Sequence, residues 1–341
     1  MKRTILNSPV FVIFFFFNIC CTQSLSAKEV PTPIDTSFLI KINGVEQYLE
    51  IKGASRTNPV LLFIHGGPAW PATPMIRKYS QELTKDFVLV SWDQRNCGKS
   101  KTDKSVKLTT QLYVEDAHEV TEFLKKTFIK QKIYVAGHSW GSTISIFLIT
   151  KYPEDYIAYL GMGQFVNPNK SNSIVKEFVI QKARINKDTA TIAIMNSFDF
   201  SPSNEYNTPF ESLMLFFQAV NPYITSGKVA VLEDPTQLYD DYKAIDWLSP
   251  LMQNGPELMK HMDSIRIDLF KYNKFKVPVY FLLGRYDYNT PSVLGEQYFN
   301  MIKAPKKKLF WFENNGHSPQ WEEPTLFYQR VLQIAAENKV N

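Results

Sequence analysis

The chain has 341 residues, 44% of them hydrophobic, and a formal net charge of +5. A charge this close to neutral excludes the strongly basic surface that is typical of nucleic-acid-binding proteins, so we expect no nucleic-acid partner. Length and apolar content together predict one large domain that carries an insertion. No spacing of the cysteines and histidines is typical of zinc, and no glycine-rich loop is typical of a nucleotide site. We therefore expect neither a metal nor a cofactor.

The first 27 residues predict a signal for export. Lys2 and Arg3 precede an apolar run at 10–21, which is shorter than the ~20 residues that a helix needs to cross a bilayer. Small residues at positions 24, 26 and 27 are suitable for signal-peptidase cleavage. We expect an exported protein, periplasmic or secreted, from which residues 1–27 are removed.

Two alternatives for this N-terminus stay open. Cys20 or Cys21 could become the lipidated first residue of a lipoprotein, although residues 17–19 fit the usual lipidation signal poorly. The apolar run could also stay uncleaved as an anchor. Apart from such an uncleaved anchor, a lipid anchor at Cys20 or Cys21 is the only membrane contact that we expect.

The rest of the chain predicts an α/β fold with a mostly parallel central sheet flanked by helices. Asn43-Gly44 is typical of a two-residue turn, and it joins two strands into a hairpin. Apolar runs then alternate with helical segments, which favours parallel strands joined by helices. The predicted elements are the hairpin at 38–42 and 45–51, strands at 59–65, 87–92, 132–137, 156–162, 277–283 and 307–312, and a closing helix near 324–337.

The alternation stops between the strand at 156–162 and the strand at 277–283. Here helical segments with aromatic anchors are broken by prolines. We interpret residues 164–275 as a helical cap that is inserted into a core formed by 28–163 and 276–341. Such a cap would screen the site beneath it from water and shape a substrate pocket.

A candidate nucleophile lies at the end of the predicted strand 132–137. Ser139 is the centre of Gly137-His-Ser-Trp-Gly141, and a predicted helix follows directly. In a turn this sharp, only small residues fit two positions before and after the serine, and the hydroxyl is held above the sheet. The alternative is a serine that serves only the turn.

A serine nucleophile needs a base, and the best candidate is His317. This histidine lies in a loop after an apolar strand, between Gly316 and Pro319, where a side chain that only fills the core is not expected. The other histidines lie in the candidate elbow, in helical segments or in a separate motif: His138, His118, His261 and His65.

The candidate for the orienting carboxylate is Asp287. It follows the predicted strand 277–283, and it lies between Ser139 and His317 in the chain, as this arrangement requires. A helix is expected to begin just after it, with Thr290 as N-cap and Pro291 at the first helical position. The alternative is an ordinary turn aspartate.

Two backbone N–H groups are needed to hold a developing oxyanion. We expect one from Trp140, the residue after the candidate nucleophile. The other is expected from Gly67, in the run His65-Gly-Gly-Pro68 that closes the strand 59–65. Pro68 has no N–H, and glycines allow a backbone to approach a substrate closely.

These motifs resemble the α/β-hydrolase fold and, more narrowly, its proline iminopeptidase branch in peptidase family S33. The resemblance covers roughly 38–163 and 276–337 and implies a serine hydrolase with a Ser-His-Asp triad. It is carried by His65-Gly-Gly-Pro68, Asp93-Gln-Arg95, Gly137-His-Ser-Trp-Gly141, Gly284-Arg-Tyr-Asp287 and Gly316-His317.

The chain departs from that branch at three points. Asn96 replaces a usual glycine, and Ala69-Trp70 replaces the glycines that usually follow His-Gly-Gly-Pro. The branch also tends to carry a Trp-Glu pair in its cap that helps to hold the substrate's free amino terminus. The only tryptophan between 164 and 275 is Trp247, and leucine rather than glutamate follows it.

We therefore expect an exported serine hydrolase that acts by acyl transfer and releases proline or a similar residue from the amino terminus of short peptides. One alternative is a carboxylesterase or amidase that acts on small esters or amides. A more remote one is a binding protein that keeps the fold without the chemistry. An aminopeptidase needs a carboxylate for the substrate's ammonium group, and the candidates are Glu205, Glu211, Glu233, Asp234 and Asp241. The sequence does not predict the oligomeric state.

Overall fold

The computed structural model describes residues 32–67, 70–101, 106–201, 209–224, 234, 237–246, 256–257 and 267–339. The predicted leader, with Cys20 and Cys21, lies outside the described residues, as do Pro68 and Ala69. The described residues belong to one compact unit, Pro31–Asn341. None of the helices within these ranges has the length and apolar character to cross a bilayer.

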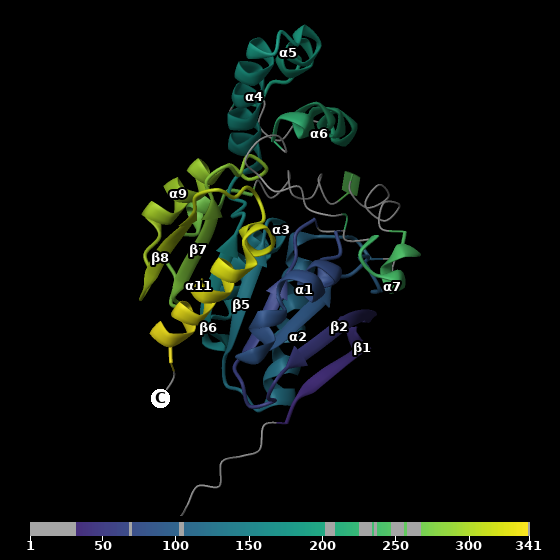
Figure 1. Ribbon diagram of the computed structural model, residues 1–341, viewed down its shortest axis with the longest axis vertical. Helices are drawn as coiled ribbons and strands as arrows, with labels where there is room; N and C mark the ends of the chain where they lie inside the picture. Colours follow the sequence, from purple (N-terminus) through teal and green to yellow (C-terminus); the bar gives the residue numbers. More distant parts are fainter. Residues whose placement is uncertain are drawn as a thin grey trace, which may run out of the picture. The chain divides into compact units, whose positions relative to one another are not determined.

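A mostly parallel sheet forms the centre of the described chain, which confirms the predicted fold class (Figure 1). Its strand order is β1-β2-β4-β3-β5-β6-β7-β8. The pairs β1–β2 and β2–β4 are antiparallel, and all other neighbours are parallel. The strands are β1 (Ile34–Ile42), β2 (Val45–Gly53), β3 (Val60–Ile64), β4 (Val88–Asp93), β5 (Ile133–His138), β6 (Tyr156–Met162), β7 (Val279–Gly284) and β8 (Lys307–Phe312).

The hairpin β1–β2 has the turn that its sequence predicts. Asn43 and Gly44 both have positive φ, 43° and 88°, and Ile42 pairs with Val45 on either side of them. Two consecutive positive φ values are those of a type I′ turn, whose twist matches the twist of the flanking strands.

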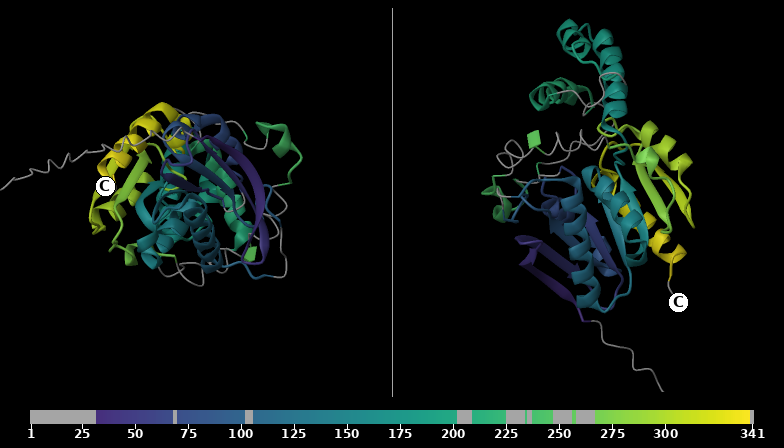
Figure 2. Two further views of the ribbon diagram at one scale, coloured as in Figure 1. Left: turned by 90° about the horizontal axis from the view of Figure 1, so that it is seen from below. Right: turned by 180° about the vertical axis from the view of Figure 1, so that it is seen from behind.

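Strand residues alternate between two apolar layers, because successive side chains of a strand point to opposite faces. In β3, Leu62 and Ile64 pack into one layer, while Leu61 and Phe63 pack into the other. Helices cover both faces, so all five residues of this strand are buried (Figure 2). The first layer contains residues of α2 (Thr110–Phe128), α3 (Trp140–Lys151) and α9 (Ser292–Met301). The second contains residues of α1 (Thr73–Tyr79), α10 (Pro319–Glu322) and α11 (Pro324–Glu337).

Further helices lie between β6 and β7 in the chain. They are α4 (Pro168–Ile185), α5 (Thr189–Asn196), α6 (Phe210–Ile224), α7 (Asp240–Lys243) and the 3₁₀ turn η5 (Leu269–Lys271). The helices α4, α5 and α6 share an apolar core of their own, which includes Val179, Met195 and Phe216. The cap boundaries 164–275 stay a prediction, because several stretches between 202 and 266 lie outside the described residues.

The parallel strands bring four loops to one edge of the sheet. The loops after β3, β5, β7 and β8 carry His65, Ser139, Asp287 and His317 respectively. Because the carboxyl ends of parallel strands lie at the same edge, these residues meet although they are far apart in the chain.

Candidate active site

Ser139 occupies a strained turn between a strand and a helix. β5 ends at His138 and α3 begins at Trp140, so the turn consists of Ser139 alone. Its φ is 53° and its ψ is −121°, a region that costs a residue with a side chain energy and that is common at functional sites. The turn is held because the N–H of Ser139 donates to the carbonyl of Met162 at 3.0 Å.

Steric contacts explain why the residues two positions before and after Ser139 are glycines. A Cβ at Gly137 would lie 2.6 Å from the carbonyl oxygen of Gly141, and a Cβ at Gly141 would overlap the carbonyl oxygen of Ile64. The Gly-x-Ser-x-Gly pattern therefore reflects how closely α3 packs against the ends of β5 and β3.

Asp287 is buried, and its carboxylate accepts several hydrogen bonds within its own loop. The N–H groups of Asn289 and Thr290 both donate to Oδ1 at 2.9 Å, and the Thr290 hydroxyl donates to Oδ2 at 2.9 Å. The prediction that Thr290 caps the next helix was wrong. That helix, α9, begins at Ser292 with Pro291 as N-cap, because the Thr290 side chain bonds the carboxylate instead.

His317 lies in the loop between β8 and α10 and contacts Asp287 directly. Its Nδ1 is 3.0 Å from Oδ2 of Asp287, and 18% of the His317 side chain is exposed against 1% for Asp287. Gly163, after β6, lies under the ring, where an added Cβ would be 2.7 Å from Cε1. The residue at 163 therefore has to be glycine, which its φ of 48° also favours.

The structure joins Asp287 to His317, but the described side chains of Ser139 and His317 form no hydrogen bond with each other. The two residues are nevertheless close, because the N–H of Ser139 donates to the carbonyl of Met162 and the next residue, Gly163, lies under the His317 ring. Hydrogen bonds of this kind are often long without substrate and tighten when it binds.

The loop after β3 lies against Ser139. A Cβ at Gly66 would be 2.9 Å from Cβ of Ser139, so this backbone passes directly beside the serine. Gly67 follows with a φ of 110°, which only glycine adopts readily. Trp140, which carries the other N–H predicted to hold an oxyanion, is the first residue of α3.

His65 fixes this loop as a neutral imidazole. Its Nε2 accepts from the N–H of Gln94 at 3.1 Å, so the ring proton is on Nδ1 and donates to the carbonyl of Gly66 at 2.6 Å. Burial lowers the pKa of His65 to about 4, and its bond to Gly66 offsets only part of that effect. The side chain of Gln94 also donates to the carbonyl of His65 at 2.8 Å.

Two residues near His317 were missed by the sequence analysis. His138 approaches the carbonyl of His317 with Nε2 at 3.1 Å, which makes Nε2–H the donor. Burial and then the nearby ring of His317 lower the pKa of His138 well below its usual value. Glu322 accepts from the N–H groups of Gly316 and Ser318 at 2.7 and 2.8 Å. The signals were weak: a histidine beside the candidate serine, and a glutamate shortly after His317.

The candidate carboxylates for an amine-binding site differ in their exposure and in the side chains that they contact. Asp241, in α7, is paired with two cations, Arg77 at 2.9 Å and Lys99. Burial raises the pKa of Asp241, but its bonds to these cations outweigh burial and lower it overall. Glu211 and Asp234 are exposed, whereas Glu205, Glu233 and Trp247 lie outside the described residues.

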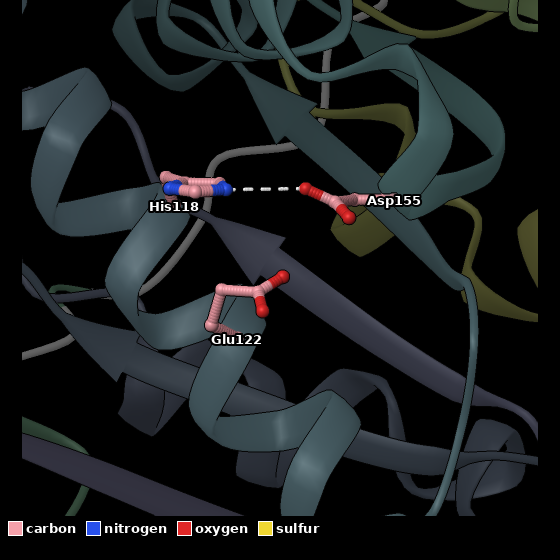
Figure 3. Close-up of side chains that lie close together, drawn as sticks. All are labelled: His118, Glu122 and Asp155. Atoms are coloured by element: carbon pink, nitrogen blue, oxygen red, sulfur yellow. Dashed lines mark hydrogen bonds and ion pairs between the residues drawn. The ribbon is translucent and has the colours of Figure 1, made fainter.

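One group of side chains in the described part of the chain has the composition of a metal site. It consists of His118 and Glu122 of α2 and Asp155 of the 3₁₀ turn η2 (Pro153–Asp155), with ligand atoms within 4.8 Å of one another (Figure 3). Nε2 of His118 is 3.2 Å from Oδ2 of Asp155. The ammonium of Lys125 pairs with both carboxylates. Because the Lys125 ammonium already pairs with both carboxylates, we assign no metal to this group.

The sheet, the strained serine after β5 and the Asp–His pair after β7 and β8 define an α/β hydrolase. Comparison with known proteins identifies a family within this class. Residues 76–324 match the family described as serine aminopeptidase, S33, and the chain belongs to this family. It is therefore a serine hydrolase that resembles proline iminopeptidases.

Individual relatives agree with this family. The chain is 31% identical over 299 residues to a probable aminopeptidase of Bacillus subtilis, covering 84% of this chain and 92% of the relative. It is 25% identical over 307 residues to a proline iminopeptidase of Saccharolobus solfataricus, covering 86% and 90%. The crystal structure of a proline iminopeptidase-related protein from Thermus thermophilus has a TM-score of 0.60 at 16% identity, covering 89% of this chain and 98% of that one.

Proposed function

We propose that the protein is an exported aminopeptidase in which Ser139 is the nucleophile, His317 the general base and acid, and Asp287 the orienting carboxylate. The hydrogen bond of 3.0 Å between Asp287 and His317 carries this proposal. It holds the ring with Nδ1–H toward Asp287, which leaves Nε2 to accept the proton of Ser139.

In this reaction the Ser139 oxygen attacks the carbonyl carbon of the scissile amide, and its proton moves to Nε2 of His317. The oxyanion accepts from the backbone N–H groups of Trp140 and Gly67, which supply charge stabilisation without reorganisation. His317 then donates the proton to the leaving amine, and water releases the acyl group by the same route.

We propose a short peptide with an amino-terminal proline or a similar residue as the substrate. The family assignment supports this, as do the names aminopeptidase and proline iminopeptidase of the relatives. The carboxylate that would pair with the substrate's ammonium group remains to be assigned among Glu205, Glu211, Glu233 and Asp234.

A second candidate, a carboxylesterase or amidase, is favoured by one observation. Asp241 is already paired with Arg77 and Lys99, so it cannot serve an ammonium group without weakening these two ion pairs. An ester or amide substrate without a free amine would not need such a carboxylate.

Export is proposed from the leader alone. Lys2 and Arg3 followed by the apolar run 10–21 support a cleaved signal peptide. Sequencing the amino terminus of the mature protein tests this. A start just after Ala27 would fit cleavage, a lipidated Cys20 or Cys21 would fit a lipoprotein, and an intact Met1 would contradict export by cleavage.

The Ser139→Ala variant tests the nucleophile. We expect hydrolysis to fall by about 10⁴-fold or more, because loss of the nucleophile removes the acyl-transfer route, and we expect labelling by a fluorophosphonate probe to disappear. Ser37→Ala, an exposed serine of β1, serves as control and should change neither readout. Retention of labelling in Ser139→Ala would contradict the assignment and, with it, the proposed mechanism.

A further inference from the structure

The backbone around His317 is held by a single carboxylate. The N–H of Gly316 donates to Oε2 of Glu322 at 2.7 Å, and the N–H of Ser318 donates to Oε1 at 2.8 Å. The two oxygens thus bind the N–H groups on either side of His317. Hydrogen bonds to an ionised acceptor are stronger than neutral ones, and a two-point contact also restricts orientation.

The helix that carries Glu322 is itself anchored in the core. Trp321, the preceding residue, is buried. Its ring stacks against Phe63 with centroids 6.4 Å apart, and it meets the ring of His138 at 5.1 Å. Because α10 is fixed by this contact with β3 and β5, its carboxylate is a fixed point for the loop.

Other parts of the fold hold the same loop from different sides. His138 donates to the carbonyl of His317 at 3.1 Å. At the end of β7, an added Cβ on Gly284 would lie 2.6 Å from the carbonyl oxygen of Asn315, so the loop rests directly on that strand. Glu322 supplies the one carboxyl group among these contacts.

The carboxyl group of Glu322 is half-buried among polar groups. Burial raises the pKa of Glu322, and its bonds to Gly316 and Ser318 and the nearby His317 offset only part of that effect. The titratable groups that contact the His317 ring itself are Asp287, from the loop after β7, and His138, from the end of β5.

We propose that Glu322 is a positioning residue that sets the place of His317 through the loop backbone. This inference rests on the proposed role of His317 as general base. It goes beyond the triad, because Glu322 contacts neither Ser139 nor the ring of His317 by a hydrogen bond. A displacement of about 1 Å in a catalytic group can cost about 10²-fold in rate.

Two variants separate geometry from charge. Glu322→Gln keeps the length of the side chain but removes the charge and one acceptor. Glu322→Asp keeps the charge but is too short to reach both N–H groups. Glu323→Gln is the matched control, because Glu323 is the next residue and half-exposed, and its side chain bonds no residue of the His317 loop in the described structure.

The measurements are kcat and KM on the substrate that the parent protein cleaves, with the unfolding midpoint of each variant. We expect kcat to fall by about 10- to 100-fold in both Glu322 variants, with KM and the unfolding midpoint nearly unchanged. Glu323→Gln should match the parent.

Each outcome decides the proposal. Equal kcat in Glu322→Gln and Glu323→Gln would overturn it. A loss of kcat that only follows a lowered unfolding midpoint, or that comes with an equal rise in KM, would reduce Glu322 to a structural role and also overturn it. Should Glu322→Gln fail to fold, the kcat of Glu322→Asp against that of Glu323→Gln decides the proposal. Failure of the proposed function would appear separately, as activity that survives Ser139→Ala.

Discussion

The backbone conformation of Asn96 explains how this residue can replace the glycine that is usual at this position of the resembled motif. Asn96 replaces a glycine of the resembled motif, and its φ is 57°. Asparagine is one of the few residues with a side chain that visits this left-handed region readily, so the replacement keeps the turn. Gly98, two residues later, is different: its φ is 55°, and an added Cβ would lie 2.6 Å from the carboxyl carbon of Asp93.

The buried His65 leads to a prediction for stability at low pH. Its pKa is lowered from 6.5 to about 4 in the folded protein. The unfolded chain therefore binds a proton at a higher pH than the folded chain does, and the stability that the neutral ring contributes is lost as pH falls from 6.5 towards 4. We expect a loss of about 2 kcal/mol from this residue between pH 7 and pH 5.

Urea unfolding at pH 7 and pH 5 measures this effect. The parent should be less stable at pH 5, and His65→Gln should show a smaller difference between the two pH values. His118→Gln is a suitable control, because that ring is half-exposed. If His65→Gln kept the full pH dependence of the parent, the buried neutral His65 would not be its source.

At the scale of elements, α7 is joined to the core through a buried carboxylate. The hydroxyl of Tyr242 donates to Oδ2 of Asp93 at 2.7 Å, and both residues are fully buried. Asp93 ends β4, and it also accepts from the Thr73 hydroxyl and the N–H of Lys99. Burial raises the pKa of Asp93 despite these donors, so every bond to it matters for keeping it ionised.

Removal of one of these donors should destabilise the protein. We expect Tyr242→Phe to lower the free energy of unfolding by about 1–3 kcal/mol, because a buried carboxylate loses a partner that water cannot replace. Tyr239→Phe is the control, because this tyrosine is half-buried and its ring, like that of Tyr242, lies beside the Arg77 guanidinium. The guanidinium carbon is 5.3 Å from the centroid of the Tyr239 ring. Equal unfolding free energies for the two variants, measured in urea, would show that the Tyr242 bond contributes nothing.

At the scale of the whole molecule, we expect the substrate class to depend on the residues between β6 and β7. If the protein is an aminopeptidase, a carboxylate must face the substrate's ammonium group, since an unpaired buried charge costs several kcal/mol. Acetylation of the prolyl nitrogen removes that charge. We expect hydrolysis of prolyl-arylamide to fall by about 100-fold or more on acetylation, which corresponds to about 3 kcal/mol.

Rates on free and acetylated prolyl-arylamide, beside a short-chain nitrophenyl ester, measure this preference. The Ser139→Ala variant provides the background rate for all three substrates. Equal rates on the two arylamides, or good ester turnover without arylamide turnover, would favour the carboxylesterase candidate. The pairing of Asp241 with Arg77 and Lys99 makes Glu205, Glu211, Glu233 and Asp234 the carboxylates to vary next.

The sequence by itself determined the class of fold and which loops carry the candidate site. Apolar runs of strand length recur between helical segments, and this periodicity is local, so β3 to β8 were located within a few residues. The turns at Ser139 and at Asn43-Gly44 could also be predicted from the sequence, because each needs a backbone conformation that only a few residue types adopt. The catalytic roles of Ser139, Asp287 and His317 stay predictions until they are tested.

Only the tertiary structure decided which side chains these loops bring together. The Thr290 hydroxyl donates to Asp287 and does not cap α9, and Asp241 forms ion pairs with two cations. Glu322 accepts hydrogen bonds from the backbone on both sides of His317. The reason is physical: a hydrogen bond depends on positions within about 3 Å, and the packing of distant segments sets those positions. A sequence pattern indicates the local backbone conformation, whereas the hydrogen-bond partners of a carboxylate depend on how the sheet and its helices pack together.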